Sequence, residues 1–160
     1  MRDQKNYPKQ LNLSDFQDKS LLILDDDDPL RGRLSRAMEK KGFIVKEAKT
    51  VSEGLQIVKN SPPPSFALVD LRLEDGSGLD VVKELFKNKK NCRIVMLTGY
   101  GNLPTAVAAI KAGAIDYMAK PVDADDIEAA LLASPESKAK PPENPMSADR
   151  VKWEHIHRVF

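Results

Sequence analysis

The stretch LLILDD, at residues 21–26, joins an apolar run to two acidic residues. The same arrangement appears in FALVD at 66–70 and, with a terminal hydroxyl in place of the acid, in IVMLT at 94–98. A fourth apolar segment, at 115–118, leads into Lys120 and Pro121. Because the carboxyl ends of parallel strands lie along one edge of a sheet, these side chains are predicted to meet in one crevice.

Segments of helical period alternate with the apolar runs, which predicts a series of β-α units. The helical stripes are formed by Leu30, Leu34, Ala37 and Met38; by Val51, Leu55 and Val58; by Leu79, Val82 and Phe86; by Val107 and Ile110; and by Ile127, Ala130 and Leu131. The strands at 43–47 and 115–118 contain charged residues and are expected at the edges. The predicted fold is α/β, a doubly wound five-stranded parallel sheet in the order 2-1-3-4-5 with helices on both faces.

Length and charge limit the possible classes of protein. The chain has 160 residues and a formal net charge of +1, so we expect one domain with extensions and no strongly charged surface for nucleic acid or membrane. No apolar stretch approaches the ~20 residues of a transmembrane helix, and the N-terminus lacks the apolar segment of a signal peptide. A cytoplasmic protein without a membrane partner is therefore expected. Cys92 is the only cysteine, which excludes an intrachain disulfide.

Composition divides the chain into four segments. Residues 1–18 are polar and are expected to form a loose N-terminal arm, followed by a folded domain over 19–133. Residues 134–146 contain four prolines and are predicted to be an extended linker. Over 147–160, Trp153, Ile156 and Phe160 share one face of a predicted helix. Because one helix cannot make its own core, this segment is expected either to dock elsewhere or to be the first helix of a truncated domain.

The predicted crevice combines carboxylates with a lysine and a hydroxyl. Two carboxylates about 4 Å apart repel by roughly 4 kcal/mol at an effective dielectric constant near 20, so the cluster requires a cation or protons. Hard oxygen ligands of this kind favour Mg²⁺. A carboxylate facing that ion can attack phosphorus to give an acyl phosphate, with Lys120 and Thr98 contacting the phosphoryl oxygens. The sequence therefore predicts phosphoryl acceptance at an aspartate.

These motifs, Asp25-Asp26, Asp70, Thr98-Gly99 and Lys120-Pro121, resemble the receiver domain of two-component response regulators over residues 20 to 133. The resemblance implies a CheY-like, flavodoxin-like fold and a phosphoacceptor that is not an enzyme beyond slow self-dephosphorylation. It implies that Asp70 accepts phosphate from a sensor histidine kinase. It also implies that Asp26 directly, Asp25 through water, Asp70 and the backbone carbonyl of Arg72 bind Mg²⁺. Thr98 and Tyr117 match the residues that switch conformation after phosphorylation.

Three longer stretches are similar to the RegA/PrrA/ActR group: DLRLEDGSGL at 70–79, TGYGN at 98–102 and PPENPMSADRVKWEH at 141–155. Regulators of this group carry a Fis-type helix-turn-helix after a proline linker and act in redox-responsive transcription. The resemblance implies a homodimer on phosphorylation and DNA binding by the intact protein. This chain is not expected to bind DNA specifically, because it ends within the first effector helix. One departure is Glu74, where many receivers have a proline, which adds negative charge beside the site.

Each motif also has an ordinary structural interpretation. Residues 25–28 could form a solvated turn in which Asp28 and Pro29 start a helix, Thr98 could end a strand in a turn, and Tyr117 could be an edge-strand aromatic. Their joint placement at four strand ends favours the receiver interpretation.

Two other functions compete with phosphoryl acceptance. A receiver-like fold could serve only as a phosphate-independent protein-binding module, and the Glu74-Asp75 loop keeps that alternative open. A Mg²⁺-dependent phosphatase of the haloacid-dehalogenase type fits less well. That family requires a second acid two residues after its nucleophile, whereas Arg72 follows Asp70 at that spacing.

Overall fold

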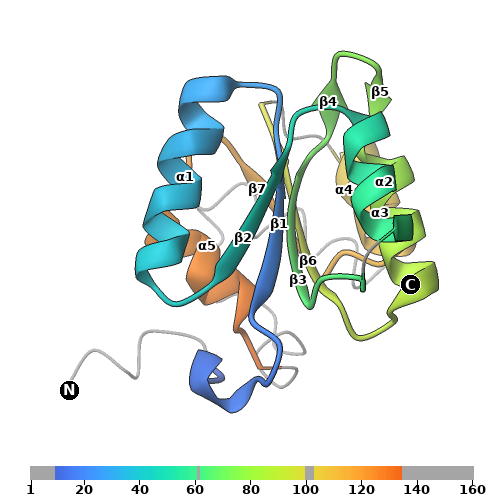
Figure 1. The fold of residues 1–160 in the computed structure, drawn as a ribbon. Helices are drawn as coiled ribbons and strands as arrows, with labels where there is room; N and C mark the ends of the chain where they lie inside the picture. Colours follow the sequence, from blue (N-terminus) through green and yellow to red (C-terminus); the bar gives the residue numbers. More distant parts are fainter. Residues whose placement is uncertain (1–9, 61, 100–102, 135–160) are drawn as a thin grey trace.

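A five-stranded parallel sheet forms the centre of the molecule (Figure 1). The structure, a computed structural model, describes residues 10–60, 62–99 and 103–134. The sheet contains β1 (Ser20–Leu24), β2 (Ile44–Ala48), β3 (Phe66–Asp70), β6 (Arg93–Thr98) and β7 (Asp116–Ala119), in the order β2-β1-β3-β6-β7. All neighbouring strands pair in parallel. The predicted doubly wound order, with the two charged strands at the edges, is confirmed.

Helices cover both faces of this sheet, as right-handed crossovers require. The helices are α1 (Asp28–Lys40), α2 (Val51–Asn60), α3 (Gly78–Asn88), α4 (Leu103–Ala112) and α5 (Ala124–Leu131). Figure 1 shows α1 and α5 on one face and α2, α3 and α4 on the other. Within the described residues, no helix is long and apolar enough to span a bilayer.

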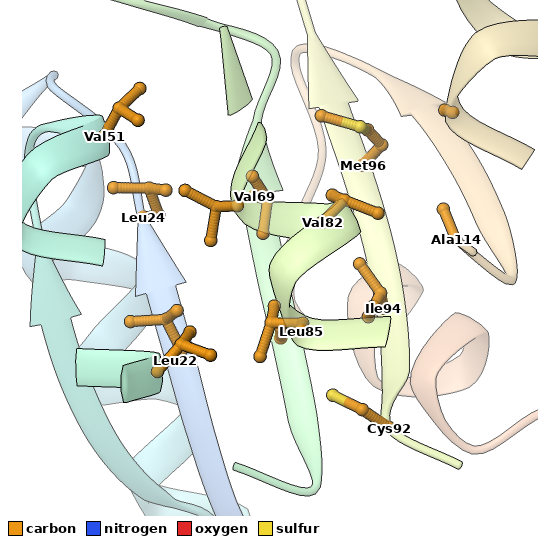
Figure 2. Close-up of a cluster of buried hydrophobic side chains, with 14 of the residues drawn as sticks. Leu22, Leu24, Val51, Val69, Val82, Leu85, Cys92, Ile94, Met96 and Ala114 are labelled. Atoms are coloured by element: carbon orange, nitrogen blue, oxygen red, sulfur yellow. The ribbon is translucent and has the colours of Figure 1, made fainter. Parts of the chain in front are cut away.

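The sheet separates two apolar cores because successive residues of a strand point to opposite faces. Along β1, Leu22 and Leu24 belong to the core under α2 and α3, whereas Leu21 and Ile23 belong to the core under α1 and α5. Figure 2 shows part of the first core, including Leu22, Leu24 and the buried thiol of Cys92. Each fully buried leucine contributes about 1.5–3 kcal/mol relative to an exposed one. Continuous apolar strands therefore stabilise both layers at once.

Helix α1 begins one residue earlier than the sequence suggested. Its N-cap is Asp27, whose side chain accepts a hydrogen bond from the Leu30 amide at 3.0 Å, while Asp28 lies in the first turn and contacts Arg31 at 2.7 Å. The sequence suggested a helix that starts at Asp28 and Pro29, with Pro29 as its first helical residue. In the structure Asp28 is the first helical residue and Pro29 the second. Asp27 caps the helix, and acidic residues are favoured at both positions by the exposed amides of a helix N-terminus.

The N-terminal segment differs from the loose arm that its polarity predicted. Gln10 forms a β-bridge with Ala133, and the Leu11 amide donates to the Leu132 carbonyl at 2.7 Å. After a short 3-10 helix, η2 (Leu13–Asp15), the ring of Phe16 packs on Phe66 with centroids 5.0 Å apart. From Gln10 on, the segment therefore packs against the end of the domain. Residues 1–9 lie outside the described residues, as does most of the predicted linker and the whole predicted C-terminal helix.

Gly78, the first residue of α3, lies against the backbone that carries Asp70. A Cβ atom at Gly78 would lie 2.1 Å from the Asp70 carbonyl oxygen and 2.8 Å from Val69 Cγ1. Because backbone atoms cannot turn away as side-chain ends can, Gly78→Ala is expected to lower the free energy of unfolding by about 3 kcal/mol, the upper end of overpacking costs. Urea denaturation of the purified protein measures this loss.

The matched control is Gly32→Ala in α1, where the nearest atom to the new Cβ is the Arg36 guanidinium at 3.4 Å. That variant is expected to gain about 0.5–1 kcal/mol from the lower entropy of alanine in the unfolded chain. Equal unfolding midpoints for the two variants would contradict the close packing of α3 on β3.

Candidate functional site

Four strand ends bring polar side chains together at one edge of the sheet. Asp25 follows β1, Asp70 ends β3, Thr98 ends β6 and Lys120 follows β7. One carboxylate oxygen from each of Asp25, Asp26 and Asp70 lies within 4.8 Å of the others. The acidic cluster predicted from the sequence is therefore assembled, at the carboxyl ends of neighbouring β1 and β3 where the strand order reverses.

Lys120 contacts two of these carboxylates. Its Nζ lies 2.9 Å from Asp25 Oδ2 and 3.2 Å from Asp70 Oδ2. The Lys120 backbone amide donates to the Thr98 carbonyl at 2.8 Å, which aligns the end of β7 with the site. Burial opposes the charged form of the lysine, but the hydrogen bond to Asp25 and the charges of both carboxylates outweigh it, so the pKa of Lys120 is raised. The lysine therefore carries its positive charge at neutral pH.

Asp70 is buried in a way that penalises its negative charge. Burial, followed by repulsion from Asp25, raises the pKa of Asp70 to about 6, although Lys120 and a backbone hydrogen bond at Arg72 act in the opposite direction. Lys120 is in contact with Asp25 and Asp70, two of the three clustered carboxylates, so it compensates the negative charge of the cluster only in part. A hard divalent cation fits the donor set, because it would be surrounded by carboxylate oxygens and would relieve the repulsion between them.

The two residues matched to the conformational switch lie on adjacent strands. Thr98 is buried at the end of β6, and the ring of Tyr117 on β7 is buried in the core that also contains Ala106 and Ala109 of α4. Tyr117 pairs with Met96 in the register between the strands. The Tyr117 side chain therefore lies in the core that α4 covers, two register positions from Thr98.

The loop after Asp70 has structure that the sequence did not suggest. It forms a two-stranded antiparallel hairpin of β4 (Arg72–Leu73) and β5 (Gly76–Ser77). The Gly78 amide donates to the Leu71 carbonyl at 2.7 Å, which closes the hairpin at the start of α3. Glu74 in its turn is exposed. The carboxylate of the neighbouring Asp75 accepts the amides of Val51 and Ser52 at the start of α2.

A groove of about 560 Å³ opens beside Lys120, between α1 and the segment that follows β7. It is lined by Asp27, Pro29, Leu30, Arg33, Gly99, Lys120, Pro121 and Val122. Lys120 therefore belongs both to the acidic cluster and to an open surface. This surface was not recognised from the sequence, because its residues come from three separated segments.

Comparison with known proteins places the chain in a family. The sequence matches the response regulator receiver domain over residues 21–132. It is 58% identical over 143 residues to the photosynthetic apparatus regulatory protein RegA of Cereibacter sphaeroides, covering 89% of this chain and 77% of that protein. It is 57% identical over 143 residues to the acid tolerance regulatory protein ActR of Rhizobium meliloti, covering 89% and 73% of the two chains.

A solved structure has the same architecture. It is a response regulator from Burkholderia pseudomallei with a phosphorylated aspartic acid, a calcium ion and citrate, superimposing with a TM-score of 0.70 at 34% identity over 89% of this chain and 84% of that one. The phosphatase alternative is not favoured by these matches. The chain belongs to the response regulator receiver domain family and, within it, to the group that contains RegA and ActR.

Proposed function

We propose that Asp70 accepts a phosphoryl group from the phosphohistidine of a sensor histidine kinase. The observation that carries this proposal is the buried Asp70 carboxylate in contact with the Lys120 ammonium, 3.2 Å away. A carboxylate oxygen attacks phosphorus, and the bond between phosphorus and the imidazole nitrogen breaks with its electron pair remaining on nitrogen. The product is an acyl phosphate whose new negative oxygens lie within reach of Lys120.

A divalent metal completes the charge balance of this proposal. Asp25, Asp26, Asp70 and the backbone carbonyl of Arg72 are the proposed ligands of Mg²⁺. The ion would supply positive charge opposite the oxygens of the transferring phosphoryl group. The proximity of the three carboxylates supports the ligand set, and a phosphorylated aspartate and a calcium ion are present together in the Burkholderia relative.

Thr98 and Tyr117 have proposed roles after the chemistry. The Thr98 hydroxyl turns toward the phosphoryl group, and the Tyr117 ring moves with it, which changes the surface formed by α4, β7 and α5. Their positions on the adjacent strands β6 and β7 support this coupling. On this surface Asp125 of α5 contacts Lys41 of its own chain at 2.5 Å.

The groove beside Lys120 is the proposed entry for the kinase. Its apolar lining by Pro29, Leu30 and Val122, with Arg33 at its side, suits the surface of a helix that carries the phosphohistidine. The chain itself belongs to a family of phosphoacceptors, and any enzymatic activity is proposed to be limited to slow self-dephosphorylation.

The whole protein is proposed to regulate transcription. Residues 19–133 are the proposed receiver, 134–146 the linker and 147–160 the first helix of a helix-turn-helix effector, with residues 1–18 as an N-terminal segment. The names of RegA and ActR, both regulatory proteins, support this role, and the proposed signal is redox state. A cytoplasmic location, dimerisation on phosphorylation and DNA binding by the intact protein belong to the same proposal.

Phosphoryl uptake is tested with acetyl phosphate, a small donor that needs no kinase. The protein is expected to gain one phosphoryl group in the presence of Mg²⁺, detected by intact mass, and Asp70→Asn is expected to gain none because the amide cannot form the acyl phosphate. Asp80→Asn, an exposed acid in the first turn of α3, is the control. An unmodified parent protein would favour the phosphate-independent module, and turnover of the donor without an adduct would favour a phosphatase.

Metal binding is tested by NMR titration of the amides around residues 25, 26 and 72 with Mg²⁺. Asp26→Asn removes one charge and one hard ligand, so at least a tenfold loss of affinity is expected, about 1.4 kcal/mol. Phosphoryl uptake should fall with it. If Asp26→Asn binds Mg²⁺ and takes up phosphate as well as the parent protein does, Asp26 is not a ligand.

Dimerisation is tested by sedimentation with and without beryllofluoride, a phosphoryl mimic. The mimic is expected to shift the protein from monomer toward dimer, since the α4, β7 and α5 surface contains an edge strand of the sheet. Asp70→Asn with beryllofluoride is the matched control and should remain monomeric. An unchanged mass for the parent protein would contradict dimerisation as the response.

A further inference from the structure

Asp75 connects the loop after the phosphoacceptor to a helix on the same side of the sheet. Its Oδ1 accepts the Val51 amide at 2.8 Å, and its Oδ2 accepts the Ser52 amide at 3.1 Å. The first amides of a helix have no partners within the helix and favour a negative charge. The pKa of Asp75 is accordingly lowered, chiefly by the hydrogen bond from Val51.

Helix α2 does not supply these hydrogen bonds from its own sequence. Thr50 Oγ1 accepts the Glu53 amide at 3.0 Å, and Glu53 Oε1 accepts the Lys49 amide at 2.8 Å, a variant of the capping box in which the return bond goes to the residue before Thr50. Neither of these bonds uses the amides of Val51 and Ser52, which donate to Asp75. Asp75, in the turn between β4 and β5, therefore caps two further amides of α2 from outside the helix.

The hairpin of β4 and β5 is short. Each of its strands is two residues long, with Arg72 opposite Ser77 and Leu73 opposite Gly76. Leu73 is buried in the same core as Val51, and both lie next to the α2 contact made by Asp75. Figure 1 shows β4 and β5 on the side of the sheet that α2 and α3 cover. Two points, the buried Leu73 and the Asp75 carboxylate, thus attach the hairpin to α2.

Arg72 begins β4, two residues after Asp70, and its backbone carbonyl is a proposed metal ligand. The Leu71 amide donates to the Leu97 carbonyl at 2.8 Å, so the chain is held by the sheet up to Leu71 and by the hairpin beyond it. A displacement of the turn at residues 74 and 75 would reach Arg72 through this short ladder, in which Arg72 pairs with Ser77.

We propose that Asp75 is a positioning residue for the phosphoryl site: by binding the amides of Val51 and Ser52 it holds the Arg72 carbonyl in place for the metal. This inference rests on the proposed function, because it concerns the metal of that site. In this proposal Asp75 acts by fixing the position of the hairpin and not by adding negative charge beside Asp70.

The test compares Asp75→Ala with Glu74→Ala in the full chain. The two variants remove the same charge from adjacent residues, but Glu74 is exposed and makes no hydrogen bond within the described part of the chain. Long-range electrostatic effects on metal binding are therefore nearly equal, and the difference between the variants reports the α2 contact. Asp75→Asn serves as the conservative variant, since its amide oxygen can accept one of the two hydrogen bonds. It also provides the measurement if the alanine variant folds poorly.

Three measurements are made on each variant: hydrogen exchange of the Val51 and Ser52 amides, the apparent dissociation constant for Mg²⁺, and the rate of phosphorylation by acetyl phosphate as a function of Mg²⁺. Asp75→Ala is expected to exchange both amides faster and to bind Mg²⁺ roughly tenfold more weakly than Glu74→Ala, a loss typical of removing a partner that orients a metal ligand. Asp75→Asn should lie between them. Saturating Mg²⁺ should restore the rate of Asp75→Ala, because the acceptor and Lys120 are unchanged.

The outcomes separate this inference from the function on which it rests. Equal Mg²⁺ affinities for Asp75→Ala and Glu74→Ala, in a parent protein that binds Mg²⁺ and takes up phosphate, would overturn the positioning role and leave the proposed function intact. Faster amide exchange with unchanged Mg²⁺ affinity would also overturn it, since Asp75 would then cap α2 without affecting the site. A parent protein that neither binds Mg²⁺ nor takes up phosphate would overturn both.

Discussion

The ammonium of Lys120 lies 2.9 Å from Asp25 Oδ2 and 3.2 Å from Asp70 Oδ2, between two carboxylates that are almost completely buried. Two such charges about 4 Å apart interact by roughly 4 kcal/mol at an effective dielectric constant near 20, so the repulsion between the acids is large enough to need this partner. Lys120 allows β1, β3 and β7 to end in polar groups within one crevice. The compensation of charge is incomplete, because Asp26 adds a third carboxylate to the cluster.

That imbalance connects structure to function. A site whose charges were fully compensated would have little affinity for a cation or for a phosphoryl group. Here the raised pKa of Asp70, about 6, expresses the cost of burying its charge beside Asp25. Asp70 is also the proposed phosphoacceptor, and its conversion into an acyl phosphate, a mixed anhydride, would change the charge of the whole cluster. The hairpin after Asp70 keeps its own acid, Asp75, away from this balance by using it at α2.

The opposite end of the domain is closed by a second set of contacts. Arg93, at the start of β6, donates from Nε to the Leu131 carbonyl at 2.5 Å and from its guanidinium to the Ala133 carbonyl. A cation at the C-terminal carbonyls of α5 is favoured by the helix dipole. Gln10 and Leu11 contact the same segment from the N-terminal side. The end of α5, from which the chain continues toward the proposed effector, is thus attached to both the sheet and the N-terminal segment.

The sequence alone determined the order of the sheet and the members of the acidic cluster. Continuous apolar runs identify strands that are covered on both faces, and parallel pairing sends the residues that follow them to one edge. Asp25, Asp70, Thr98 and Lys120 could therefore be grouped without coordinates. Only the tertiary structure decided the contacts between segments that carry no local signal. Asp75 binds α2 across 24 residues of sequence, Lys41 contacts Asp125 across 84, and the polar stretch from Gln10 packs on the end of α5. Periodicity reports which face of an element is buried, whereas the partner of an exposed carboxylate or an unpaired backbone amide depends on which elements the fold brings within hydrogen-bonding distance.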